Sequence, residues 1–185
     1  MQRIAVITGA SSGIGEATAL LLATRGWHCI LVARREDRLR ALAGAIGGEA
    51  EPCDIGDRAA VETLAARILE RHPAIHALVN TAGMPARRQF TDVDLDLVEE
   101  VARVNYLGGV WLTRGLLPGL RPAPGAARTH IVNVASVAGA IASAPAGADA
   151  IAPATDATFT MWVRAASGAG RSPGSRPRVN QTPPR

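Results

Sequence analysis

The chain has 185 residues, of which 48% are hydrophobic, and this suffices for one globular domain with a sizeable core. Its 20 basic residues, all arginine, outnumber 16 acidic ones, and the excess comes from residues 164–185. That segment has no acidic side chain and no aromatic side chain on which a base could stack, so we expect no nucleic-acid partner. No apolar run could span a membrane, no signal peptide is recognisable, and Cys29 and Cys53 form no disulfide or metal-binding pattern, so we expect a cytoplasmic protein with no membrane partner and no metal.

Strand-like and helix-like segments alternate along most of the chain. Apolar runs predict strands at 3–7, 28–33, 49–53, 75–80 and 130–135. Helical spacing of apolar residues predicts helices at 16–25, 36–46, 57–72 and 94–117, with Pro118-Gly119 ending the last of these. This alternation requires parallel strands with right-handed crossovers. We therefore expect an α/β fold with a doubly wound, Rossmann-like parallel sheet.

A glycine-rich turn joins the first predicted strand to the first predicted helix. Glycine lets a backbone turn tightly and approach a pyrophosphate closely, and the following helix N-terminus offers N–H groups to phosphate oxygens. A glycine pattern in this context predicts a dinucleotide site. Its expected residues are Thr8, Gly9, Ser11, Ser12, Gly13, Ile14 and Gly15.

The pattern weakens after Ser136. Alanine dominates residues 138–157, and a further helix is predicted at 154–166. Beyond it, Gly, Ser, Pro and Arg offer too little apolar surface to order the backbone. We therefore expect a dinucleotide-binding domain at 1–166 and a disordered tail at 167–185.

Four features in order carry a family resemblance: the glycine turn, Asn80-Thr81-Ala82-Gly83 after a strand, Asn105 within the long helix, and Ser136 after the last predicted strand. Together they resemble the short-chain dehydrogenase/reductase (SDR) family, classical type, over residues 1–166. The family has a second asparagine where this chain has Thr81.

The resemblance also implies roles for single residues. Asp54, followed by Ile55, would accept a hydrogen bond from the adenine amino group, and Asn80, Ala82 and Gly83 would stabilise the sheet and line the cofactor. Ser136 would orient a substrate carbonyl, and Asn105 would hold a water in a proton relay. The alternatives from the residues themselves are a strand-end cap for Ser136 and a buried amide bonded to backbone for Asn105.

The end of the strand at 28–33 bears on the choice of cofactor. An acidic residue there would bind the ribose 2′-hydroxyl of NAD, whereas this chain has Arg34-Arg35, which suit a 2′-phosphate. We therefore expect NADP(H) in preference to NAD(H). The alternative is that Arg35 pairs with Glu36 or Asp37 on the surface.

The chain departs from the family at the reactive end. The family's acid/base tyrosine and its lysine, in a Tyr-x-x-x-Lys segment, align with Asp149 and Pro153. The single tyrosine is Tyr106, and no lysine exists. The carboxyl group of Asp149 would be ionised at neutral pH, and it could donate a proton only if burial raised its pKa considerably. The resemblance further implies that the last strand and the substrate-covering segment are missing, which would leave the sheet incomplete at its C-terminal edge.

Three hypotheses follow. The first is an NADP(H)-dependent oxidoreductase acting on an unknown small carbonyl or alcohol, with impaired chemistry. The second is a silent NADP-binding module that pairs, as a homo- or hetero-oligomer, through its long helices. The third is a degenerate, truncated product.

Overall fold

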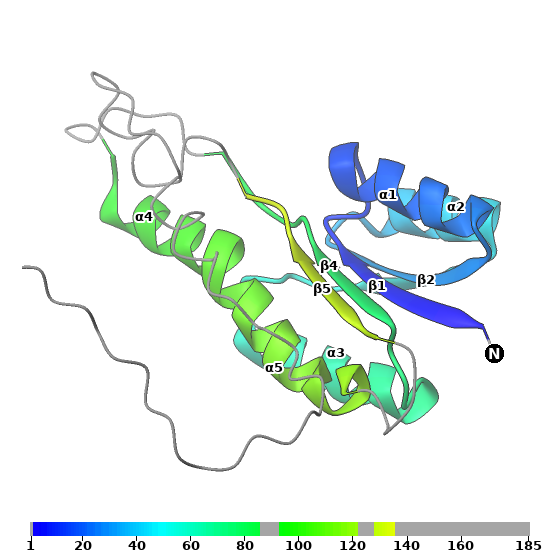
Figure 1. Ribbon diagram of the computed structural model, residues 1–185. Coiled ribbons are helices and arrows are strands. Elements are labelled where there is room, and N and C mark those ends of the chain that lie inside the picture. The colour runs from blue at the N-terminus through cyan, green and yellow to red at the C-terminus, as the bar shows by residue number, and fades with distance from the viewer. Residues whose placement is uncertain (1, 86–92, 122–127, 136–185) are drawn as a thin grey trace, which may run out of the picture.

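The computed structural model describes residues 2–85, 93–121 and 128–135 (Figure 1). These residues contain a five-stranded sheet in the order β3-β2-β1-β4-β5, with every neighbouring pair parallel. The strands are β1 Arg3–Thr8, β2 Trp27–Ala33, β3 Glu49–Pro52, β4 Ala77–Asn80 and β5 His130–Asn133. The expected Rossmann-like parallel sheet is therefore confirmed. The predicted helix at 154–166 and the tail at 167–185 lie outside the described residues.

Helices cover both faces of this sheet. In Figure 1, α1 and α2 lie on one side, and α3 and α5 pack together on the other. The helical segments are α1 Gly13–Thr24, α2 Glu36–Ile46, α3 Arg58–Arg71, α4 Leu95–Ala102, the π-helical η2 Arg103–Leu107, and α5 Gly108–Leu120. The first helix begins three residues earlier than its apolar spacing predicts, so its N-terminus lies within the glycine turn.

β1, β2 and β4 are buried along most of their length, and the side chains of β1 and β2 alternate between two cores. Val6 and Ile30 belong to the core beneath α3 and α5, whereas their neighbours Ile7 and Leu31 belong to the core beneath α1 and α2. All four are fully buried. Burial on both faces explains why these strands read as apolar runs, whereas β3 is mostly half-buried and β5 is mostly exposed.

The predicted helix at 94–117 differs from the structure in two respects. It is one continuous path of α4, η2 and α5, in which Gly108 N–H donates to Arg103 O across a π turn. It also continues through Pro118 to Leu120. Tertiary hydrogen bonds explain this extension, because the Gly119 carbonyl accepts from Ile75 N–H at 2.9 Å and the Leu120 carbonyl accepts from the Thr129 hydroxyl at 2.5 Å.

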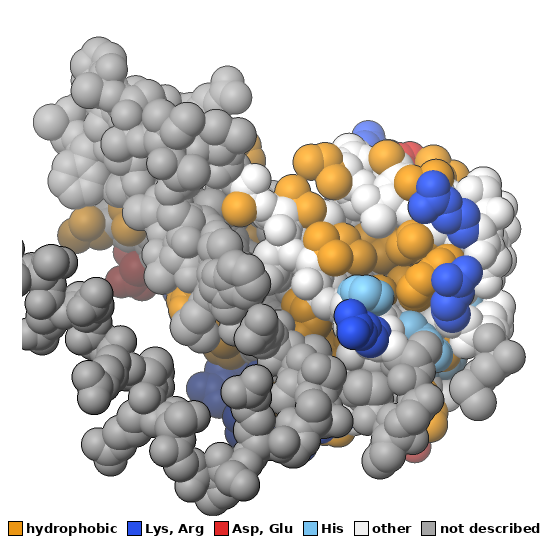
Figure 2. Space-filling view, in the orientation of Figure 1, with side chains coloured by type: hydrophobic (Ala, Val, Ile, Leu, Met, Phe, Trp, Pro, Cys, Tyr) orange, Lys and Arg blue, Asp and Glu red, His pale blue; other side chains and the backbone are white. Residues whose placement is uncertain are grey.

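Some apolar side chains remain at the surface. Figure 2 shows apolar side chains on the visible face of the molecule. In α1, the side chains of Ile14, Leu20 and Leu21 are exposed. Both cysteines are free, and burial raises the pKa of each thiol to about 11, with a further upward contribution from nearby Asp54 at Cys53. Among the described residues, no helix combines the length and apolar character that a membrane crossing requires.

Candidate functional site

A cavity of about 360 Å³ opens at the carboxyl edge of the sheet, where β1, β2 and β4 end. Parallel strands direct their following loops to this edge, which is where open α/β sheets bind ligands. Nine of the predicted site residues line it: Thr8, Gly9, Ser11, Ser12, Arg34, Arg35, Ile55, Ala82 and Gly83. The structure thus brings the glycine turn, the end of β2 and the segment after β4 to one place.

The glycine turn lies in close contact with the segment after β4. Gly9 has a φ of +65°, and a Cβ there would lie 2.9 Å from the backbone of Ala82. A Cβ on Gly15 would lie 2.6 Å from the Gly9 carbonyl oxygen and 2.7 Å from Thr81 Oγ1. Side chains at these two positions would therefore push the turn away from β4.

Thr8 fastens the two segments together. Its buried hydroxyl oxygen accepts hydrogen bonds from the backbone N–H groups of Thr81 and Ala82, each at 3.0 Å. The Thr81 hydroxyl in turn donates to the Thr8 carbonyl oxygen. The threonine that replaces the family's second asparagine thus takes part in holding the turn.

Arg35 reaches from the end of β2 to the glycine turn. Its guanidinium donates to Ser11 Oγ at 3.1 and 3.0 Å and to Ser12 Oγ at 2.5 Å. The surface pairing of Arg35 with Glu36 or Asp37 is not what the structure has, since Glu36 instead pairs with Arg40 at 2.5 Å. The rim of the cavity therefore combines the Arg35 guanidinium with two serine hydroxyls, and Arg34 lines it as well.

Asp54 follows β3 and is exposed near the opposite rim. Its Oδ1 accepts from Gly56 N–H at 2.9 Å, which turns the chain so that Ile55 is buried in the cavity wall. One carboxylate oxygen of Asp54 is thus engaged in a local turn.

A second, smaller cavity of about 20 Å³ continues inward and shares Thr8, Ile55, Ala82 and Val104 with the first. Asn80, Asn105 and Ala135 also line it. Buried Asn80 donates from Nδ2 to Asn133 Oδ1 at 2.9 Å and to Thr113 Oγ1 at 3.3 Å. Its Oδ1 has no hydrogen-bond partner among the described residues.

The amide of Asn105 is bonded to the backbone of one residue. Its Oδ1 accepts from Met84 N–H at 2.8 Å, and its Nδ2 donates to Met84 O at 3.1 Å. This is the backbone-bonded arrangement weighed above as the alternative to water binding. Asn105 lies in the centre of η2, and π segments occur often at functional sites.

The remaining predicted residues divide into two groups. Gly13, Ile14 and Gly15 begin α1 and direct its first N–H groups toward the turn. Ser136, Asp149 and Pro153 lie outside the described residues. Sequence reasoning missed the lining residues Val32, Ala33, Cys53 and Val104, although the first three end or follow predicted strands and could have been found by their position at the carboxyl edge.

Comparison with known proteins identifies the family. The sequence model of the short chain dehydrogenase family matches residues 3–149. An uncharacterised oxidoreductase of Mycobacterium tuberculosis is 46% identical over 120 residues, which are 64% of this chain and 46% of the relative.

Solved structures agree. A short-chain dehydrogenase from Streptomyces avermitilis has a TM-score of 0.78 at 30% identity, covering 86% of this chain and 57% of that one. A metagenomic short-chain oxidoreductase, solved in complex with NADP, has a TM-score of 0.75 at 32% identity, covering 86% of this chain and 73% of that one.

The chain spans about half the length of the curated relatives that it matches. The family match nevertheless covers most of the sequence and includes every described strand. The ordered motifs, the parallel sheet and the glycine turn at its carboxyl edge agree with that match. The chain belongs to the short-chain dehydrogenase family of oxidoreductases.

Proposed function

We propose that this chain binds a nicotinamide dinucleotide in the cavity at the carboxyl edge, and that it prefers NADP(H) to NAD(H). The observation that carries the preference is the Arg35 guanidinium, which lies against Ser11 and Ser12 beside Arg34. Within the part of the chain that the structure describes, no carboxylate lines this cavity. A 2′-phosphate would meet two positive charges and two hydroxyl donors there.

The residues present fit the rest of the group as well. The absence of a Cβ at Gly9 and Gly15 lets the turn pack closely against neighbouring backbone, and α1 supplies a helix N-terminus for the pyrophosphate. The inner cavity offers the buried Oδ1 of Asn80 as an acceptor. These features support a cofactor that extends from the arginine rim toward β4 and β5.

Calorimetric titration with NADPH and NADH tests the preference. Arg35→Gln should weaken NADPH binding about 10- to 100-fold, the equivalent of one or two charge-assisted hydrogen bonds, and leave NADH binding nearly unchanged. Arg38→Gln is the matched control, because Arg38 is an exposed arginine of α2 that does not line the cavity. Equal binding of both dinucleotides by the unaltered chain, or an equal loss for both in Arg35→Gln, would overturn the role of Arg35.

We further propose that hydride transfer is impaired. When bound, the nicotinamide supplies or accepts the hydride, and a side chain must give or take the carbonyl proton. Ser136 and Asn105 stand at two of the family's catalytic positions, but Asp149 and Pro153 stand where its tyrosine and lysine would be. Catalytic residues that act as a unit fail together, which favours a silent NADP-binding module as the second candidate function.

Turnover measurements separate these possibilities. The chain should oxidise NADPH no faster than the blank across a panel of small ketones and aldehydes, while still binding it. The double substitution Asp149→Tyr with Pro153→Lys restores the family's residue types and should raise the rate. A kcat for the unaltered chain in the ordinary enzyme range, about 1–10³ s⁻¹, would refute impairment.

A further inference from the structure

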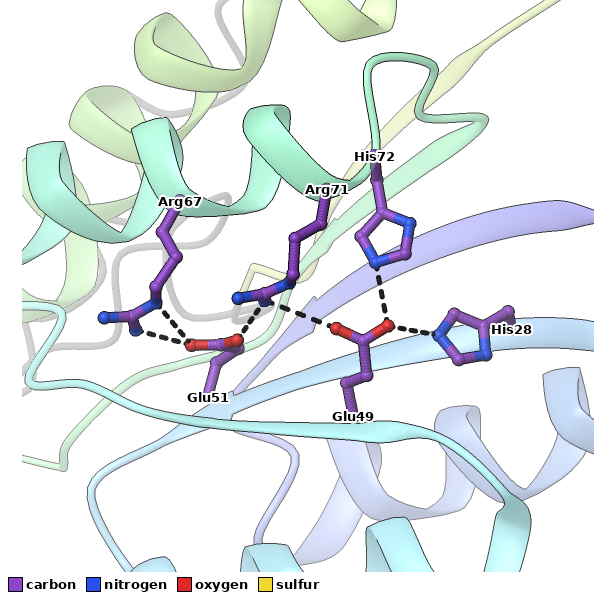
Figure 3. A network of polar contacts seen from close by, with 6 residues as sticks. All are labelled: His28, Glu49, Glu51, Arg67, Arg71 and His72. Carbon is purple, nitrogen blue, oxygen red and sulfur yellow. Dashed lines mark hydrogen bonds and ion pairs between the residues drawn. The ribbon is translucent and has the colours of Figure 1, made fainter.

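Two histidines and a glutamate meet at the amino edge of the sheet, opposite the cavity (Figure 3). His28 is the second residue of β2, Glu49 is the first residue of β3, and His72 follows the end of α3. Arg34 follows His28 by six residue steps along β2, at about 3.3 Å per step, so this cluster lies roughly 20 Å from the arginine rim. It belongs to no part of the site described above.

Both imidazole rings face the same carboxylate oxygen. The Nε2 atoms of His28 and His72 lie 2.7 and 2.8 Å from Glu49 Oε1, and the ring centroids are 5.6 Å apart. The three ligand atoms all lie within 4.8 Å of one another. Three potential ligands from three separate elements thus converge on one point.

One arginine holds the Glu49 carboxylate. Arg71 lies 3.3 Å from Glu49 Oε2, so Oε1 is left to face the rings (Figure 3). Arg71 also pairs with Glu51, and Arg67 pairs with the other oxygen of Glu51 at 2.5 Å. Outer partners of this kind orient ligating carboxylates in metal sites.

Glu49 is the acidic member of the cluster. Burial alone would raise its pKa, but hydrogen bonds and charge from His28 and His72 hold that pKa below its ordinary value. The side chains of His28, Glu49 and His72 are 18%, 30% and 16% exposed, which leaves a route for an ion from solvent.

We propose that His28, Glu49 and His72 form a binding site for a first-row divalent transition metal, with Zn²⁺ as the best match. Two imidazole nitrogens and one carboxylate oxygen are the ligand types that Zn²⁺ prefers, and water completes a tetrahedron. In the absence of metal, each Nε2 lies at hydrogen-bond distance from Oε1. To bind a metal, each ring must be neutral with its proton on Nδ1, so that the Nε2 lone pair is available; any proton on Nε2 is released to solvent. Tetrahedral bonds of about 2.0–2.1 Å separate ligands by roughly 3.3 Å, so the carboxylate must shift by about half an ångström.

Such a site would link the end of α3 to β2 and β3, two strands that already pair in the sheet. A bound ion should therefore raise the melting temperature, because it binds the folded chain and not the dispersed ligands. This effect requires no cofactor and no turnover, so the metal site and the proposed function can fail independently.

The test uses tag-free, full-length protein that has been stripped with EDTA and returned to chelator-free buffer. Titration with Co²⁺ should produce the visible d–d absorption of a tetrahedral site, and calorimetry with Zn²⁺ should give one ion per chain. His72→Gln should weaken Zn²⁺ affinity about 100-fold or more, and His28→Gln should do the same. His130→Gln is the matched control, since His130 is an exposed histidine of β5, and its affinity should match the unaltered chain.

Three results would overturn the proposal. The first is a Co²⁺ titration of the unaltered chain without d–d absorption, which judges the site regardless of how the variants fold. The second is Co²⁺ absorption with thiolate charge-transfer bands, which would place the ion at a cysteine. The third is equal Zn²⁺ affinity in His72→Gln and His130→Gln when far-ultraviolet circular dichroism shows both to be folded.

Discussion

Gly15 and Gly44 both lie in helices, but only Gly15 is in close contact with other backbone atoms. Comparing alanine substitutions at the two positions measures how much that close contact at the glycine turn affects stability. Gly15 in α1 has no room for a Cβ, which would lie 2.6 Å from the Gly9 carbonyl oxygen. Gly44 in α2 has no heavy atom within 4 Å of the same position. Gly15→Ala and Gly44→Ala therefore add the same methyl group to a helix, once against a backbone and once into open space.

The magnitude follows from two terms. Replacing glycine by alanine in a helix stabilises it by about 0.5–1 kcal/mol, and this is the whole expected effect of Gly44→Ala. At Gly15 the same gain is opposed by an overlap with main-chain atoms that cannot rotate away, and inserted methylenes of this kind cost about 1–3 kcal/mol. The helix term approximately cancels between the variants, so Gly15→Ala should be less stable than Gly44→Ala by about 1–3 kcal/mol.

Urea unfolding monitored by circular dichroism measures both free energies of unfolding. In thermal scans the difference corresponds to a melting temperature roughly 2–12 °C lower for Gly15→Ala, at 2–4 °C per kcal/mol for a domain of this size. Equal stability of the two variants would refute the reasoning, because it would mean that the start of α1 does not lie as close to the Gly9 carbonyl as the structure has it.

Two further predictions concern acidic residues of the described part. Glu51→Gln should lower the free energy of unfolding at neutral pH by about 1–3 kcal/mol, because Glu51 is buried while its partners are partly exposed. Glu62→Gln removes an exposed ion pair and should change this free energy by less than about 0.5 kcal/mol. Equal effects of the two substitutions in urea unfolding would contradict this prediction. The lowered pKa of Glu49 stabilises the fold at pH values above 4.5, the ordinary pKa, and this stability is lost as the pH falls through the folded pKa. In EDTA, Glu49→Gln should therefore lose less stability than the unaltered chain between about pH 5 and about pH 3. Parallel profiles of stability against pH would contradict this prediction.

The fold could be predicted because its signals are local. β1, β2 and β4 are buried on both faces, so an apolar run such as Ile4 to Ile7 can be recognised without tertiary information. The long helix was only partly predictable. Its π segment has no local signal in the sequence, and its continuation through Pro118 is accompanied by a hydrogen bond from Ile75, which is distant in sequence.

The candidate site also combines features that the sequence predicts with contacts that it does not. The glycine turn and Arg34-Arg35 have recognisable neighbours along the chain, so their position at the carboxyl edge could be predicted. The bonds from Arg35 to Ser11 could not, because they cross between two loops and depend on side-chain length and rotamer. The cluster of His28, Glu49 and His72 was also invisible, since its members are 21 and 23 residues apart with no motif between them.

The strand order has a consequence for how the chain is made. β1 lies between β2 and β4, so it obtains one neighbour once residue 33 is available and the other only after residue 80. At a synthesis rate of about 5–20 residues per second, these two events are separated by roughly 2–9 s on the ribosome. During that interval, the edge of β1 that will later pair with β4 has no neighbouring strand. An unpaired strand edge can pair with another chain, so this edge of β1 is the one exposed to association during synthesis.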